Sequence, residues 1–149
     1  MKGTTMATIH KVEEFMDKKF VSLHAEWDVL KAIDIFLEKG VTSSVVVNDN
    51  MQVVGILSEK DCLKLMTKGS YYQLPGGKVS DFMTKDVYCI PPYTDIFKVA
   101  DIFIHHNFRR LIITDEDKKV IGQITRRDML RTIKQLKEEL KEKKIAPIL

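Results

Sequence analysis

The hydrophobic positions of the chain form a helical pattern that occurs twice. The first instance comprises Val29, Ala32, Ile33, Phe36 and Leu37, and the second comprises Ile96, Val99, Ala100, Phe103 and Ile104, 67 residues later. A spacing of i, i+3, i+4, i+7 and i+8 predicts an amphipathic helix with one buried face. Gly40 follows the first helix and Asn107 the second, and both residue types favour the left-handed geometry that ends a helix.

Two apolar runs follow each helix and predict a β-hairpin. Residues 44–47 and 53–57 are separated by the turn formers Asn48, Asp49 and Asn50. Residues 111–114 and 120–124 are separated by the acidic residues 115–117. Asn and Asp are typical turn residues. The chain therefore contains two predicted hairpins in equivalent positions.

The remaining elements complete one repeating unit. Short helices are expected at 11–16 and 78–83, short strands at 20–23 and 87–90, and closing helices from Ser58 and Thr125 onward. Residues 11–63 align with 78–130 without a gap, and 14 of the 53 positions are identical. We therefore predict an α/β protein with two β-α-β-β-α repeats, 11–68 and 78–136, a linker at 69–77, and a charged helical extension at 137–149.

Composition excludes several classes of protein. An apolar content of 44% and a charged content of 30% are ordinary globular values. No apolar run is long enough to span a membrane, so a cytoplasmic location is expected. The net charge of +3 arises entirely after residue 130, among alternating Lys and Glu, and does not form the one-sided basic surface of a nucleic-acid-binding protein.

The reactive side chains do not form a recognisable catalytic or metal site. Cys62 and Cys89 lack metal-ligand spacing and are interpreted as small packing residues. His105 and His106 are adjacent on a helix and cannot face one metal ion together, so they are expected at the surface. The chain is therefore predicted not to be an enzyme and to require no cofactor.

A heptapeptide at the end of each hairpin is the candidate binding motif. Gly55 to Asp61 and Gly122 to Asp128 both read Gly, two residues, a hydroxyl, two residues, Asp. A helix that starts at Ser58 or Thr125 offers free N–H groups to a phosphate, and the Asp one turn later could accept the two hydroxyls of a ribose. The same spacing is also a capping box, which needs no ligand. The glycine is not required for capping, and it favours the ligand because a flat group could approach its backbone.

The whole pattern resembles a tandem pair of CBS domains, often called a Bateman module. The matching features are the opening Phe-Met of each repeat, the helix with an Ala, the hairpin, and the closing Gly-x-x-Ser/Thr-x-x-Asp. The resemblance implies two pseudo-symmetric repeats packed sheet to sheet, with adenosine ligands in the clefts between them. It also implies that pairs of modules commonly associate, and a homodimer is expected here.

The resemblance also implies roles for individual residues. Ser58 and Thr125 would contact ribose or phosphate, and Asp61 and Asp128 would hold ribose. The short strands would flank the base through Val21, Ser22, Leu23, Tyr88, Cys89 and Ile90. Arg109 and Arg110 resemble a phosphate-binding His-Arg pair of some relatives and would make one cleft more basic, although an ordinary solvated loop is the alternative. Val45 and Ile112 depart from the family, whose strands often carry Pro there.

The sequence supports two functional hypotheses. The first is a stand-alone regulatory or sensor module that binds an adenosine nucleotide of the AMP, ADP or ATP class. The alternative is a nucleotide-independent module that binds a partner, or a second copy, through its C-terminal helix. The number of phosphates, the number of occupied clefts, the dimer arrangement and any regulated protein are left open by the sequence.

Overall fold

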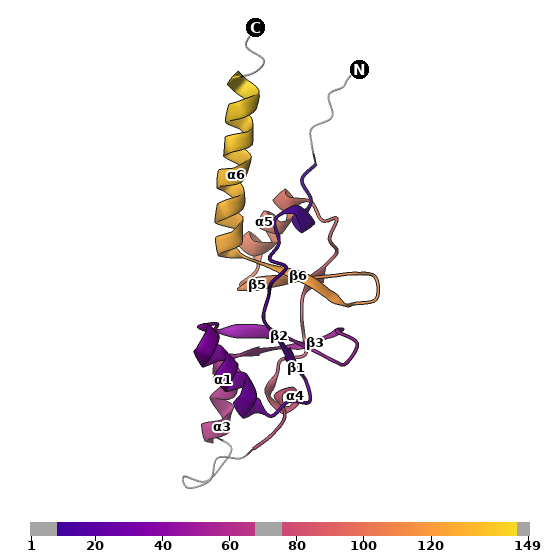
Figure 1. Cartoon of the computed structure of the whole chain (residues 1–149), viewed down its shortest axis with the longest axis vertical. Coiled ribbons are helices and arrows are strands. Elements are labelled where there is room, and N and C mark those ends of the chain that lie inside the picture. Colours follow the sequence, from indigo (N-terminus) through magenta and orange to yellow (C-terminus); the bar gives the residue numbers. More distant parts are fainter. Residues whose placement is uncertain (1–8, 68–75, 146–149) are drawn as a thin grey trace.

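The structure is a computed structural model that describes residues 9–67 and 76–145 (Figure 1). The first half contains η1 (Val12–Glu14), β1 (Ser22–His24), α1 (Val29–Lys39), β2 (Ser43–Val47), β3 (Val53–Ser58), α2 (Glu59–Cys62) and α3 (Lys64–Thr67). The second contains α4 (Val79–Phe82), β4 (Cys89–Ile90), α5 (Ile96–His105), β5 (Arg110–Thr114), β6 (Val120–Thr125) and α6 (Arg126–Ile145). Most of the predicted linker, 69–77, lies outside the described residues.

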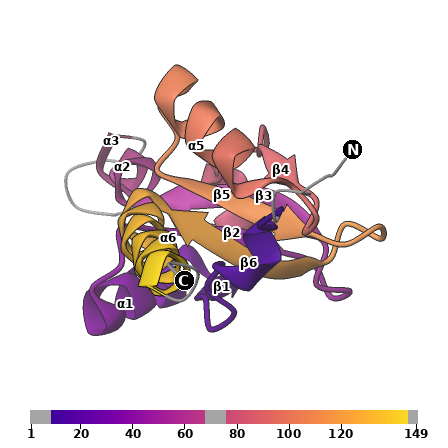
Figure 2. The same ribbon diagram turned by 90° about the horizontal axis from the view of Figure 1, so that it is seen from above.

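Two three-stranded sheets form the centre of the molecule. Their strand orders are β1-β2-β3 and β4-β5-β6, with a parallel first pair and an antiparallel second pair in each. The sheets face each other, and helices lie beyond both of them (Figures 1 and 2). An inter-sheet layer is formed by Val45, Val47, Ile112 and Val120, all at most 7% exposed. The predicted α/β fold with two paired repeats is confirmed.

The two amphipathic helices begin at equivalent caps. Asp28 accepts a hydrogen bond from the Leu30 amide at 2.9 Å, and Asp95 accepts one from the Phe97 amide at the same distance. Each bond satisfies one of the free N–H groups at a helix start. The sequence predicts equivalent apolar faces on the two helices, and the equivalent caps start both helices at the same position of the repeat.

The two helices end differently, and one prediction about them is wrong. Gly40 takes φ +64° and ends α1 in the left-handed conformation, as predicted. Asn107 does not do this for α5, because the chain leaves that helix one residue earlier, at His106, in an extended conformation (φ −133°). The His106 ring stacks on Phe108, with ring centres 5.0 Å apart. An extended exit therefore replaces the left-handed one.

The predicted buried faces are also narrower than expected. Val29, Ala32 and Phe36 are buried, but Leu37 is 77% exposed, and its equivalent Ile104 is 78% exposed. The last apolar position of each helix thus lies outside the core. Both helices leave an apolar edge in contact with solvent.

Each repeat inserts its leading segment into the core of the other repeat. The first helix-side cluster combines Leu23, Phe36 and Leu57 with Val79 and Phe82 of α4. The second helix-side cluster combines Ile96, Val99, Phe103, Leu111 and Ile124 with Val12 of η1, and Phe15 and Met16, which follow η1, pack against it. The predicted boundaries at 11–68 and 78–136 divide the sequence, whereas in space the segments near 12–17 and 79–84 are exchanged.

Backbone hydrogen bonds fix this exchange. The Val12 amide donates to the Thr94 carbonyl and the Val79 amide to the Trp27 carbonyl, both at 2.8 Å. Asp17 then pairs with Gln123 on β6 through two bonds of 2.7 and 3.0 Å. Thr84 pairs in the same way with Ile56 on β3, at 2.8 and 2.9 Å. Every exchanged segment is therefore held by main-chain bonds as well as by its apolar side chains.

The motif glycines make room for this exchange. A Cβ at Gly122 would lie 2.4 Å from Met16 Sδ, and a Cβ at Gly55 would lie 2.6 Å from Met83 Sδ. At Gly55 it would also lie 2.9 Å from the Thr84 carbonyl oxygen, which is backbone. The prediction that these glycines let a flat ligand approach the backbone is wrong, because methionines of the opposite repeat occupy the space.

The closing helices of the two repeats differ in length. The first breaks at Leu63, between α2 and α3, whereas α6 continues for 20 residues and projects from the body (Figure 1). Leu136 packs against the second helix-side cluster, and Glu139 contacts His10 at 3.4 Å. Beyond these contacts Leu140 is 58% exposed, so the last turns of α6 extend past the core.

Substitution of each glycine by alanine should separate the two docking sites. We expect Gly55→Ala to lower the free energy of unfolding by about 1–3 kcal/mol, as overpacking does, and Gly122→Ala to cost less, because a flexible Met16 side chain can move. Urea denaturation of the single and double variants checks this. Gly122→Ala should become nearly neutral in a Met16→Ala background, whereas Gly55→Ala should stay costly in a Met83→Ala background. Equal costs at the two sites, with full rescue of both, would contradict the backbone clash at Gly55.

Candidate functional site

Both heptapeptides fold as a strand end joined directly to a helix start. In the first, Ser58 is the last residue of β3 and the cap of α2. The Asp61 Oδ2 atom accepts hydrogen bonds from the Ser58 amide at 2.9 Å and from the Ser58 hydroxyl at 3.0 Å, and the Asp61 amide donates to that hydroxyl at 3.2 Å. The predicted capping box is therefore present.

The second heptapeptide repeats this geometry. Asp128 Oδ2 accepts from the Thr125 amide and hydroxyl, both at 2.9 Å, and the Asp128 amide donates to the hydroxyl at 3.2 Å. Both hydroxyls and both Oδ2 atoms already form hydrogen bonds, so a ligand that binds them would compete with these caps. The capping interpretation is confirmed as a description of the structure.

The other carboxylate oxygen of each Asp points to a nearby cation. Asp61 Oδ1 lies 3.3 Å from Lys64 Nζ, and Asp128 Oδ1 lies 3.0 Å from Arg131 Nη1. Both cations are on the helix surface, and such pairs contribute little to stability. A carboxylate oxygen accepts about two hydrogen bonds, so each Oδ1 has capacity for one further donor. The expectation that each Asp holds two ribose hydroxyls therefore requires Lys64 or Arg131 to move.

Five of the predicted residues converge on one pocket of about 250 Å³. Ser58 and Asp61 line it from the first repeat, and Tyr88, Arg109 and Arg110 line it from the second. The rest of the lining is Ser43, Ile56, Thr84, Asp86, Val87, Asn107, Phe108 and Ile112. We call this the Asp61 pocket. It brings a helix start, a buried carboxylate and two guanidinium groups together across the interface between the repeats.

Arg110 is the most unusual group in this pocket. Its side chain is half-buried in the inter-sheet region, and Nη1 donates to Gln123 Oε1 at 3.0 Å. The buried Nε has no hydrogen-bond partner among the described residues. Burial lowers the pKa of the Arg110 guanidinium, the charge of Arg109 lowers it further, and Asp128 acts in the opposite direction. A buried donor without a partner on a partly desolvated cation is costly, and an anion in the pocket would relieve that cost.

The second heptapeptide does not line this pocket. Thr125 pairs with Arg110 in the β5–β6 ladder, and Gln123 lies two residues before Thr125. In the first repeat, Ser43 stands in the place of Arg110 and pairs with Ser58, and Ile56 stands in the place of Gln123. The two heptapeptides therefore have different surroundings. Arg109 and Arg110 belong to the second repeat but line the pocket of Asp61, which belongs to the first.

Several predicted residues lie elsewhere. Leu23 and Ile90 are 0% and 5% exposed in the helix-side clusters, so they do not flank the Asp61 pocket as predicted, because adjacent strand residues face opposite sides of a sheet. Val21 accepts the Ser44 hydroxyl at 2.8 Å through its carbonyl. Ser22 pairs with Val45 in the β1–β2 ladder.

The two cysteines also differ from each other. Cys62 is buried in the first helix-side cluster, which agrees with its predicted packing role. Cys89 is exposed, so its interpretation as a packing residue is wrong. It precedes Ile90 on the two-residue strand β4, and only Ile90 faces the core.

Phe108 lines the pocket beside the predicted residue Tyr88 and was not identified from the sequence. The Tyr88 ring centre lies 5.0 Å from that of Phe108, which in turn stacks on His106 with an interplanar angle of 16°. Phe108 follows α5 outside the helical periodicity, which was its only sequence signal. Tyr88 and Phe108 both line the Asp61 pocket and present flat apolar surface to it.

No group of three or more His, Cys, Asp and Glu side chains suited to a metal ion occurs within residues 9–67 and 76–145. His105 contacts Asp101 of its own helix, at 2.9 Å to the carbonyl and 3.1 Å to the carboxylate. Among the same described residues no helix has the length and apolar content needed to cross a membrane.

Comparison with known proteins matches both repeats to one family. The model of the CBS domain matches residues 12–68 and again 79–135. The crystal structure of CBSX2 in complex with AMP superposes with a TM-score of 0.74 at 29% identity, covering 86% of this chain and 98% of that one. A second structure of CBSX2, from Arabidopsis thaliana, has a TM-score of 0.77 at 28% identity over 88% and 99% of the two chains.

Longer proteins match over part of their length. An uncharacterized protein of Methanocaldococcus jannaschii, MJ1225, is 28% identical over 123 residues, which is 82% of this chain and 42% of that protein. The A-adding tRNA nucleotidyltransferase of Aquifex aeolicus is 30% identical over 130 residues, which is 87% of this chain and 15% of the enzyme. The chain thus spans less than half the length of these two relatives.

Loss of the caps should be measurable without any ligand. We expect Asp61→Ala and Asp128→Ala each to lower the free energy of unfolding by about 1 kcal/mol, because each removes the acceptor for two hydrogen bonds at a helix start. Urea denaturation in nucleotide-free buffer gives these values. Asp→Asn at either position retains an acceptor and should cost less. If neither alanine variant is destabilised, the caps do not contribute to stability.

Proposed function

The chain belongs to the CBS-domain family, of which it carries a tandem pair, and from this we propose that it binds an adenosine nucleotide in the Asp61 pocket and acts as a regulatory module. The observation that carries the proposal is Arg110, whose buried Nε has no partner among the described residues and whose guanidinium lines the pocket. A phosphate at this position would accept charge-assisted hydrogen bonds from Arg110 and Arg109. AMP is the preferred candidate within the AMP, ADP and ATP class, since the related CBSX2 is described in complex with AMP.

The other parts of a nucleotide have suitable neighbours. The rings of Tyr88 and Phe108 offer a surface against which an adenine could stack, an interaction worth about 1–3 kcal/mol per base. Asp61 Oδ1 would accept one ribose hydroxyl beside Lys64, and a second hydroxyl after Lys64 moves aside. Ser58 at the start of α2 remains part of the cap and positions Asp61. In this arrangement the ligand contacts both repeats.

A ligand that contacts both repeats provides a mechanism for regulation. Ser58 and Asp61 belong to one repeat and Arg109 and Arg110 to the other, so binding favours the relative position in which all four groups reach the nucleotide. We propose that Thr125 and Asp128 form a second, weaker site, because the arginine pair lines the pocket of Asp61. No catalytic step is proposed for the chain.

We also propose that the module forms a homodimer through its helices. Four pairs of exposed apolar residues, each 67 residues apart, lie on α1 and α5 and on the closing helices: Leu30 and Phe97, Leu37 and Ile104, Leu63 and Leu130, Met66 and Ile133. A surface with the same two-fold pattern in both repeats suits a symmetric contact with a second copy. Leu136, which follows Ile133 on α6, is not part of this face, because it packs against the second helix-side cluster.

Calorimetry with AMP and adenosine tests the nucleotide site. Removal of a hydrogen bond to a charged group costs about 1.5–3 kcal/mol, so we expect Arg110→Ala to weaken AMP binding by about tenfold or more and adenosine binding much less. Asp61→Ala should weaken both ligands. Asp81→Ala is the matched control, because Asp81 Oδ2 accepts the Lys78 amide at the start of α4, so this substitution removes the same kind of cap outside the pocket.

Two outcomes would reject the proposal. If Arg110→Ala and Asp61→Ala both bind AMP like the parent, the heptapeptides serve only as caps. The nucleotide-independent interaction module would then be the better account, with the exposed end of α6 as its binding element. If Arg110→Ala weakens AMP and adenosine equally, the arginine does not meet the phosphate.

Light scattering at micromolar concentration tests the dimer. We expect the parent to be dimeric and a Met66→Glu, Ile133→Glu double variant to be monomeric, because the new charges would be buried without partners. Leu140→Glu on the same helix as Ile133 is the control, since Leu140 lies beyond the paired positions. A monomeric parent, with and without AMP, would refute the dimer.

A further inference from the structure

A second pocket lies on the other side of the segment that borders the Asp61 pocket. It has a volume of about 380 Å³ and is lined by Lys85, Cys89, Thr114 and Lys118, with Val53, Val54 and Val87 as its apolar part. We call it the lysine pocket. Thr84, Asp86 and Tyr88 line the Asp61 pocket, whereas Lys85 and Cys89 line the lysine pocket, as expected for an extended segment with alternating side chains. The two pockets are therefore separate, with only Val87 bordering both.

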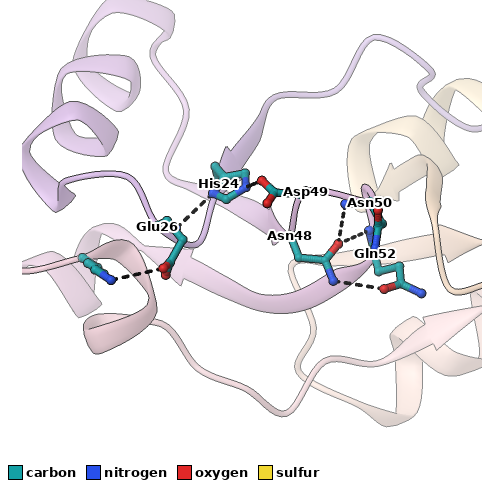
Figure 3. Close-up of polar contacts among 7 residues, drawn as sticks. His24, Glu26, Asn48, Asp49, Asn50 and Gln52 are labelled. Carbon is teal, nitrogen blue, oxygen red and sulfur yellow. Dashed lines mark hydrogen bonds and ion pairs between the residues drawn. The ribbon is translucent and has the colours of Figure 1, made fainter.

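The backbone around the lysine pocket is fixed by contacts between the two hairpin tips. Gln52 Nε2 donates to the Asp117 carbonyl at 3.0 Å, and the Val53 amide donates to the Lys118 carbonyl at 3.1 Å. The Gln52 side chain is itself held by Asn48, whose Nδ2 donates to Gln52 Oε1 at 3.0 Å (Figure 3). Lys118 takes φ +65°, so its side chain leaves the turn from a conformation that few residues adopt.

The same network anchors the first hairpin tip to the rest of its sheet. His24 at the end of β1 contacts Asp49 in the turn, with Nε2 and Oδ1 2.5 Å apart (Figure 3). The His24 Nδ1 atom accepts the Glu26 amide at 3.0 Å, so Nε2 carries the proton that is donated to Asp49. The tip that supports Lys118 is thus tied to both sheets.

The charge of the lysine pocket is not balanced. Neither Lys85 nor Lys118 forms an ion pair within the part of the chain that the structure describes, and no carboxylate lines the pocket there. Other lysines do have acidic partners, such as Lys64 with Asp61 and Lys78 with Glu26. Cys89 and Lys118 line the same pocket. Although Cys89 is exposed as a residue, partial desolvation of its thiol raises the pKa of Cys89, and the Lys118 ammonium opposes that rise. Two cations beside apolar surface form a site for an anion.

The equivalent place in the first repeat lacks these groups. Met51 stands where Lys118 stands, at nearly the same φ (+63°), and Val47 and Ser22 stand where Thr114 and Cys89 stand. Phe20 replaces Val87 and packs against the inter-sheet layer. Only Lys18, the equivalent of Lys85, is retained. The lysine pocket is therefore particular to one side of the module and does not follow from the repeat itself.

We propose that the lysine pocket binds a small organic anion, with its charged group between Lys85 and Lys118 and a short apolar part against Val53, Val54 and Val87. The Thr114 hydroxyl offers one further hydrogen bond to the anion. This site is independent of the nucleotide proposal, because it uses none of the residues assigned to phosphate, ribose or base.

Alkylation of Cys89 by iodoacetamide reports on the pocket directly. The probe is phenyl phosphate, benzyl alcohol is its uncharged counterpart, and peptide mass spectrometry gives the rate at Cys89 separately from buried Cys62. We expect phenyl phosphate at millimolar concentration to slow the reaction several-fold, because it covers the thiol and neutralises Lys118, and benzyl alcohol to have little effect.

Variants decide whether the protection comes from this site. Lys118→Met introduces the residue that the first repeat carries at the same φ, and it should abolish most of the protection, as should Lys85→Met. Lys18→Met is the matched control and should retain it, and so should Arg110→Ala, which removes the proposed phosphate-binding group of the other pocket. For each variant, the protection factor is the ratio of the alkylation rates without and with the probe. This ratio cancels any effect of the lysine substitution on the reactivity of the thiol itself.

The inference is overturned by any of three results. These are an absence of protection, equal protection by benzyl alcohol, or protection that survives both lysine substitutions. Protection that disappears in Arg110→Ala would place the anion in the Asp61 pocket and overturn it as well.

Discussion

The reciprocal docking of the two leading segments is the constraint on which the rest of the structure depends. Val12 and Val79 are both fully buried, each in a cluster built otherwise from the opposite repeat. Neither cluster is complete without a segment that lies on the far side of the linker in sequence. The two repeats therefore cannot be regarded as separable domains, and removal of either would expose apolar surface in the other. The pairing of Ile56 with Thr84 and of Gln123 with Asp17 joins each segment to the opposite sheet, and both Ile56 and Thr84 line the Asp61 pocket.

The elements of this fold could be predicted because their signals are local. A helical period of apolar residues, an Asp cap and a turn of Asn and Asp each act within a few positions, and the 67-residue repeat showed each signal twice. The exchange of segments could not be predicted, because a repeat gives equal sequence support to docking within a copy and docking between copies. Gly55 and Gly122 show the consequence: the sequence indicated that a close approach occurs there, but not that Met83 and Met16 make it.

The candidate site was predictable to a similar extent. Ser58 and Asp61 were found from their spacing, and both interpretations of that spacing predicted the same bonds, so only the structure could show that the caps are formed. Arg110 was ambiguous because a pair of arginines after a helix is commonly solvated; its burial depends on the opposite sheet, which no local pattern describes. Phe108 and Lys118 had little local signal, since Phe108 derives its importance from Tyr88 and Lys118 from Lys85 and Cys89, which are all distant in the sequence.

The extended segment from Thr84 to Cys89 has a further consequence as a wall shared by two pockets. Its even-numbered side chains line one pocket and its odd-numbered ones line the other, with Val87 in contact with both. If this segment moves toward one pocket, it moves away from the other. A ligand bound on one face would therefore change the affinity for a ligand on the other face. By thermodynamic reciprocity, whatever factor one occupant imposes on the affinity of its neighbour is imposed in return. If the Asp61 pocket binds a nucleotide and the lysine pocket an anion, as proposed, the two ligands would affect each other's affinity through this one extended segment.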